Sequence, residues 1–83
     1  MPRNKPWPDC YQLALRRLGL QPEEAVAFED SQHGLAAAVA AGVPAIAIPT
    51  PISAEHDFRR ATAICTDLVA ATDWLTRHRT LPR

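Results

Sequence analysis

Apolar residues along the chain follow two spacings, one typical of helices and one typical of buried strands. From Asp9, apolar side chains recur at intervals of three and four residues, and Gly19 then supplies a stop; the positions are Tyr11, Ala14, Leu15 and Leu18. This spacing predicts an amphipathic helix that begins at Asp9 and ends at Gly19.

Two uninterrupted apolar runs enclose an alanine-rich helical segment. The runs Ala25–Phe28 and Val43–Ile48 are typical of parallel strands that are covered on both faces. Between them, the pattern predicts a helix over His33–Ala41, with Ser31 as its N-cap and Gly42 at its end.

The rest of the chain continues the alternation of helix and strand. Ser53 is positioned to cap a short helix over Ala54–Arg60, and Thr62–Cys65 reads as a third strand. Asp67 is positioned to cap a last helix, and the tail from Arg79 is expected to be loose. Such alternation predicts an α/β fold, in which a parallel sheet is flanked by helices.

Length and charge limit the classes of protein to which the chain can belong. A chain of 83 residues is at most one small domain, here residues 1–83. Nine basic residues balance nine acidic ones, which gives no reason to expect nucleic acid or a membrane surface as a partner. No membrane-span run or signal-peptide pattern occurs, so a cytoplasmic location is expected.

Glu29 and Asp30 stand side by side where the first predicted strand ends. Ligands of open parallel sheets bind outside the carboxyl ends of the strands. Two carboxylates at such an end suit Mg²⁺, which prefers a few carboxylates together with water and phosphate oxygens. The alternative is a solvated turn in which Asp30 or Ser31 only caps the following helix.

Lys5 is the only lysine among nine basic residues, and the other eight are arginines. Arginine and lysine are not interchangeable at a tight site, so this exception is consistent with a need for a compact ammonium at position 5. Chance is the alternative explanation.

Two segments carry a family resemblance. They are K-P-W-P-D at Lys5–Asp9 and F-E-D-S-Q-H-G-L-A-A-A-V-A-A-G at Phe28–Gly42. In this order, with a helix and a P-E-E turn between them, they resemble the haloacid dehalogenase superfamily, in its branch of β-phosphoglucomutase-like phosphatases. The resemblance extends to about Leu75 and implies the C-terminal portion of a Rossmann-like core, with the cap domain and the N-terminal strand absent.

The resemblance implies roles for four residues. Lys5 matches the lysine that contacts the phosphoryl group and the nucleophilic carboxylate. Asp30 matches the magnesium ligand, and Glu29 assists it directly or through water. Ser31 is either a residue that orients Asp30 or simply the helix cap. An ammonium and Mg²⁺ together offset the charge of a phosphoryl group in transfer.

The chain departs from the family because it contains no D-x-D sequence. The family's nucleophile and general acid/base lie in that motif. The resemblance therefore implies Mg²⁺-dependent phosphoryl transfer from a small phosphate ester, such as a sugar phosphate, through an aspartyl-phosphate in the complete enzyme, and no turnover by this chain alone. The alternative is a non-catalytic binding module, or one half of a split enzyme, that associates with a partner or with itself through an exposed sheet edge.

Overall fold

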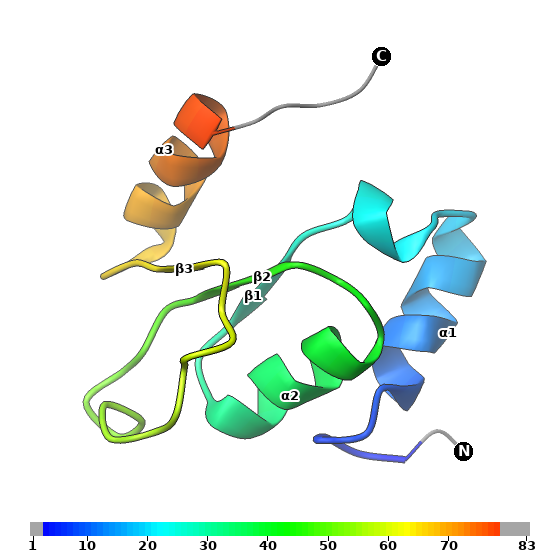
Figure 1. The fold of residues 1–83 in the computed structure, drawn as a ribbon, viewed down its shortest axis with the longest axis horizontal. Coiled ribbons are helices and arrows are strands. Elements are labelled where there is room, and N and C mark those ends of the chain that lie inside the picture. The colour runs from blue at the N-terminus through cyan, green and yellow to red at the C-terminus, as the bar shows by residue number, and fades with distance from the viewer. Residues whose placement is uncertain (1–2, 79–83) are drawn as a thin grey trace.

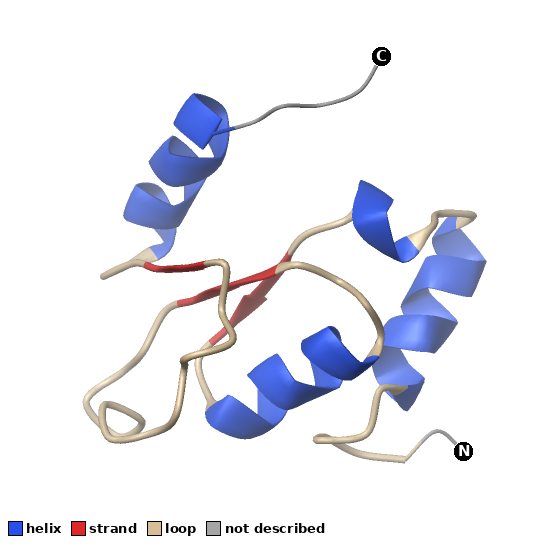
Figure 2. Ribbon diagram, viewed as in Figure 1, coloured by secondary structure: helices blue, strands red, loops and turns tan. Residues whose placement is uncertain are grey.

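The computed structural model describes residues 3–78 and contains a parallel sheet between helices. Its elements, in chain order, are the helix α1 (Asp9–Leu18), the 3₁₀ turn η1 (Pro22–Glu24), the strand β1 (Ala27–Glu29), the helix α2 (Gln32–Ala40), the strands β2 (Ala45–Ala47) and β3 (Ala63–Ile64), and the helix α3 (Leu68–His78). Figures 1 and 2 show this order along the ribbon. The predicted α/β architecture is confirmed.

The three strands lie in the order β1-β2-β3 and are all parallel. Ala27 pairs with Ala45, Glu29 pairs with Ala47, and Ala47 pairs in turn with Ile64. This register brings the carboxyl ends of the strands to one edge of the sheet. The end of β1 carries Glu29 and, one residue later, Asp30.

The helices cover the two faces of the sheet unequally. α2 packs on β1 and β2, and α1 packs against α2. α3 lies on the opposite side of the sheet (Figure 1). Small side chains let α2 approach closely, since Ala37 and Ala38 are almost completely buried. Leu35 joins them in the core between this helix and the sheet.

Helix ends follow the sequence prediction closely. Gly19 adopts a left-handed conformation with φ of 69°, and its N–H donates to the last turn of α1. The Ser31 side chain accepts a hydrogen bond from Gly34 N, and the Asp67 side chain accepts one from Ala70 N. These side chains therefore satisfy N–H groups that the first turns of α2 and α3 leave free.

The predicted helix over Ala54–Arg60 is wrong. Residues 51–60 form turns, and Ser53 is buried with its hydroxyl accepting from Thr50 N instead of capping a helix. Phe58 enters the core, and His56 bonds to the start of α2. These tertiary contacts outweigh the weak tendency of a seven-residue segment to form a helix by itself.

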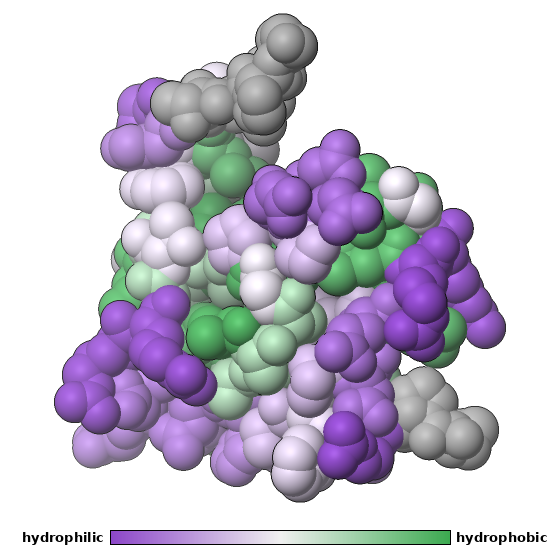
Figure 3. Space-filling model, turned by 45° about the vertical axis from the view of Figure 1, so that its right-hand side comes forward, coloured by the Kyte–Doolittle hydropathy of each residue, from purple (hydrophilic) through white to green (hydrophobic). Residues whose placement is uncertain are grey.

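The first strand is covered on one face only, which also differs from the prediction. Ala27 and Glu29 are buried, whereas Val26 and Phe28 are each more than a third exposed. Green hydrophobic atoms are visible at the surface in the space-filling view, between purple hydrophilic ones (Figure 3). No helix in residues 3–78 is long and apolar enough to cross a membrane. The prediction for the tail from Arg79 falls outside the described residues.

Leu35→Ala tests whether the contact between α2 and the sheet holds the fold together. Leu35 is 2% exposed, and truncating such a leucine should lower the free energy of unfolding by about 2–5 kcal/mol. Urea denaturation followed by circular dichroism measures the change. The matched control is Leu18→Ala at a residue 69% exposed, where the loss should stay within about 0.5 kcal/mol. Equal losses at both positions would contradict the packing of Leu35 between α2 and the sheet.

Candidate functional site

The site is built where the turn before α1 meets the carboxyl end of β1. Lys5 lies in that turn, and its Nζ is 3.1 Å from Oε1 of Glu29, which is 24 residues away in the sequence. The lysine side chain is half-exposed, whereas Glu29 is only 7% exposed. The structure therefore brings together the predicted lysine and one of the two predicted carboxylates.

Glu29 is buried because alternate residues of a strand point to opposite faces. It shares the covered face of β1 with Ala27, toward α2. A buried carboxylate is costly unless it has partners. Lys5 is one partner, and the Tyr11 hydroxyl is the second, donating a hydrogen bond to Oε2. Glu29 is thus not part of a solvated turn.

Tyr11 was not predicted as a site residue, because its position fits the apolar face of α1. It is half-buried, and its hydroxyl reaches the Glu29 carboxylate. Burial, together with the hydrogen bond to Glu29 and that residue's charge, raises the pKa of Tyr11 well above its usual value. The one feature of the sequence that could have pointed to Tyr11 is its hydroxyl on an otherwise apolar helix face, since Tyr11 is the only tyrosine in the chain.

Gly34 provides the room that the Glu29 carboxylate occupies. A Cβ built at Gly34 would overlap Oε1 and the carboxyl carbon of Glu29. The glycine therefore matters for this side chain and not only for close packing between the helix and the sheet. The N–H of the same residue donates to Ser31 Oγ at 3.1 Å. This N-cap bond holds the first turn of α2, and with it Gly34, beside the site.

Asp30 and Ser31 have different environments from Glu29. Asp30 is exposed at the end of β1. Ser31 is half-buried, and its side chain is the N-cap of α2, which confirms the capping alternative. That Ser31 orients Asp30 stays a prediction. The two neighbouring carboxylates thus divide into one that is buried and paired and one that faces solvent.

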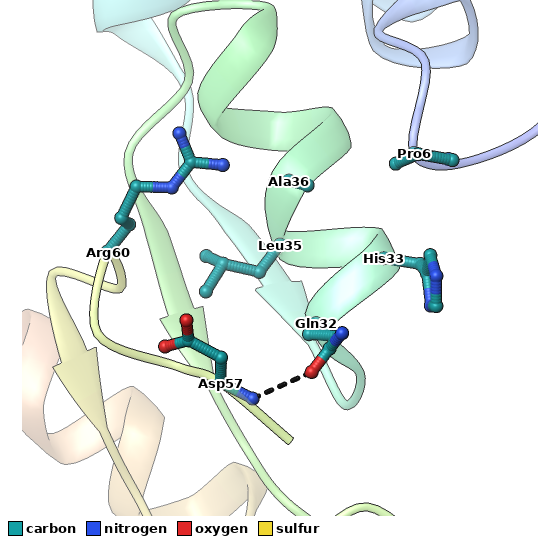
Figure 4. A pocket seen from close by; sticks show the side chains of 7 residues that line it. All are labelled: Pro6, Gln32, His33, Leu35, Ala36, Asp57 and Arg60. Carbon is teal, nitrogen blue, oxygen red and sulfur yellow. Dashed lines mark hydrogen bonds between the residues drawn. The ribbon is translucent and has the colours of Figure 1, made fainter.

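The loop after β2 is tied to the first residue of α2. The Gln32 N–H donates to His56 Nδ1 at 3.1 Å, and the Asp57 N–H donates to Gln32 Oε1 at 2.8 Å. Beside this connection lies a cavity of about 280 Å³ (Figure 4). Its lining residues are Pro6, Gln32, His33, Leu35, Ala36, Asp57 and Arg60. The cavity therefore adjoins α2 without including Lys5, Glu29 or Asp30.

Asp57, at the rim of this cavity, is held ionised by a neighbour. Hydrogen bonds from the Arg59 guanidinium and backbone N–H lower the pKa of Asp57 to about 2. Both side chains are exposed, so the ion pair contributes little to stability.

The carboxylates of Glu29 and Asp30 suit a hard divalent cation, but they supply only part of the coordination shell of such an ion. Glu29 and Asp30 offer carboxylate oxygens, the ligand type that Mg²⁺ prefers. Within residues 3–78, no three His, Cys, Asp or Glu side chains come together as a metal-binding group. Further oxygen ligands would have to come from water, from a phosphate, or from residues outside this part of the chain.

Comparison with known proteins agrees with the sequence resemblance. The family profile described as haloacid dehalogenase-like hydrolase matches residues 1–42. The chain is 40% identical over 74 residues to protein CbbY, plasmid, of Cupriavidus necator, covering 89% of this chain and 29% of that protein. It is 46% identical over 43 residues to fructose-1-phosphate phosphatase YqaB of Escherichia coli, covering 52% of this chain and 23% of that protein.

A solved structure shares the fold as well as the sequence. The crystal structure of CbbY from Rhodobacter sphaeroides in complex with phosphate superposes with a TM-score of 0.76 at 43% identity. The match covers 78% of this chain and 29% of the CbbY chain. The chain thus spans less than a third of the length of these relatives. It belongs to the haloacid dehalogenase-like hydrolase family.

Proposed function

We propose that this chain forms the lysine and carboxylate side of a site that hydrolyses small phosphate esters. The observation that carries the proposal is the placement of Lys5 beside Glu29 at the carboxyl end of β1, with the exposed Asp30 next in sequence. An ammonium and two carboxylates at this edge of a parallel sheet suit a phosphate-bearing ligand and Mg²⁺. The family membership supports the same reaction class.

Each residue has a distinct part in the proposed reaction. The ammonium of Lys5 contacts phosphoryl oxygens and offsets their negative charge. Asp30 ligates Mg²⁺ directly, and Glu29 assists directly or through a water molecule. Bound Mg²⁺ would supply further positive charge to the phosphoryl group and fix its orientation.

The covalent step needs a carboxylate nucleophile that the 83 residues do not provide as a D-x-D motif. In the complete reaction, one aspartate oxygen of the D-x-D motif attacks phosphorus while the ester P–O bond breaks, and the leaving alcohol oxygen takes a proton from the general acid/base aspartate of the same motif. That aspartate then takes a proton from the water that attacks phosphorus, the P–O bond to the first aspartate breaks, and phosphate leaves while the carboxylate is restored. We propose sugar phosphates as the substrate class because relatives include a protein named for fructose 1-phosphate.

Asp30→Asn tests the metal part of the proposal. Titration calorimetry with Mn²⁺, a probe for Mg²⁺, should detect weak binding by the 83-residue chain, and Asp30→Asn should abolish it because the exposed ligand loses its charge. The control Asp73→Asn removes one exposed carboxylate from α3 and should leave the binding unchanged. No binding by the unaltered chain, or equal loss in both variants, would contradict the proposal. Turnover of fructose 1-phosphate by this chain alone would contradict its expected inactivity.

A second proposal follows from the free edge of β1. In the described residues, β1 has a neighbour on one side only, and Ala27 N and Glu29 O bond toward β2. The N–H and C=O of Phe28 therefore point away from the sheet. An unpaired edge beside exposed Val26 and Phe28 favours pairing with another chain. We propose that this edge is an association surface, either for a second copy or for a polypeptide that supplies the nucleophile.

Phe28→Lys tests the association surface. The unaltered chain should dimerise or form larger species as its concentration rises, and a lysine at the free edge should shift it toward the monomer. Analytical ultracentrifugation measures the distribution of masses. Ile52→Lys is the control, because it changes an apolar residue that is 93% exposed in the loop after β2. A monodisperse monomer of the unaltered chain at every concentration would rule out self-association.

A further inference from the structure

The hydroxyl of Tyr11 makes a hydrogen bond that packing of the tyrosine ring in the core does not require. Tyr11 lies on the inner face of α1, half-buried, where a phenylalanine ring would fill the same space. The hydroxyl makes its hydrogen bond to Glu29 Oε2, 18 residues along the chain. The other oxygen of that carboxylate faces Lys5. The single tyrosine of the chain thus meets the buried carboxylate of the site.

Two contacts together restrict how the carboxylate can turn. The terminal torsion of a glutamate is broad, so a carboxylate with one partner can rotate. Here Lys5 holds Oε1 and Tyr11 holds Oε2, while the missing Cβ of Gly34 leaves the space in which the group lies. Because Lys5 is itself half-exposed, a carboxylate that is free to rotate would leave the ammonium without a fixed position.

We propose that Tyr11 is a positioning residue that acts through Glu29. Its hydroxyl fixes the orientation of the carboxylate, and the carboxylate in turn fixes the Lys5 ammonium beside the end of β1. The expected effect on metal and phosphate binding rests on the proposed function. The fixed orientation of the Glu29 carboxylate does not rest on it, because it follows from the contacts alone. Partners of this kind, hydrogen-bonded to a ligating carboxylate, typically change metal affinity by about 10- to 100-fold.

Tyr11→Phe tests the proposal on the 83-residue chain. The variant should bind Mn²⁺ about 10- to 100-fold more weakly, as measured from the electron paramagnetic resonance signal of free Mn²⁺. In a Glu29→Gln background the same substitution should have no further effect, because the charged partner is gone. Thr72→Val is the control: it removes a hydroxyl that bonds within α3 and should not change the affinity. Unchanged Mn²⁺ affinity in Tyr11→Phe would overturn the proposal.

A second measurement tests the role of Tyr11 without metal, so this proposal and the proposed function can fail independently. The ¹³C NMR signal of the Glu29 carboxyl carbon and the ¹⁵N signal of the Lys5 amine report the arrangement without metal. Both should shift in Tyr11→Phe and stay unchanged in Thr72→Val. If the unaltered chain binds no Mn²⁺, the proposed function fails and these signals alone decide whether Tyr11 is a positioning residue. Identical signals in Tyr11→Phe and the unaltered chain would overturn it.

Gly34→Ala tests whether the carboxylate lies where the Tyr11 contact requires. The new Cβ would displace Glu29 from its partners, so the melting temperature should fall although alanine favours a helix over glycine. In a Glu29→Ala background the overlap is absent, and Gly34→Ala should then raise the melting temperature. This reversal of sign is the expected result. An increase in both backgrounds would mean that the carboxylate lies elsewhere, and it would overturn the proposed role of Tyr11.

Discussion

The pairing of one buried carboxylate connects the three parts of this structure that form the site. Glu29 ends β1, Lys5 lies in the turn before α1, and Tyr11 lies on α1. A carboxylate this deeply buried needs charged or hydrogen-bonding partners, because an unpaired ion in the interior is strongly disfavoured. The turn and α1 must therefore reach the end of β1 for the strand to keep Glu29 on its covered face.

The small residues of α2 contribute both to helix packing and to the burial of this carboxylate. Ala37 and Ala38 allow the helix to lie close to the sheet, and Gly34 leaves space for the carboxylate at the point where the helix begins. A larger residue at any of these positions would separate α2 from β1 or push Glu29 away from Lys5. Packing of the helix and chemistry of the site thus depend on one set of small side chains.

Features governed by local sequence could be predicted, and features governed by tertiary contacts could not. Ser31 and Asp67 cap helices as their positions indicated, since a cap needs only neighbours three residues away. Residues 54–60 have equally local helical signals, yet the burial of Phe58 and the bond from Gln32 to His56 hold them in turns. The contact of Tyr11 with Glu29 joins residues 18 positions apart, and the spacing of apolar residues along α1 carries no information about it.

The division between Glu29 and Asp30 bears on how the proposed site would respond to a ligand. Glu29 is fixed by groups of this chain, so its position does not depend on anything bound, whereas Asp30 is exposed and its surroundings are completed by whatever meets the end of β1. In the proposed site, a preorganised group would lower the cost of binding, and an exposed carboxylate would be open to a metal ion. The free edge of β1 lies beside this same end, so an added strand would reach Asp30 without disturbing the pair that Lys5 and Glu29 already form.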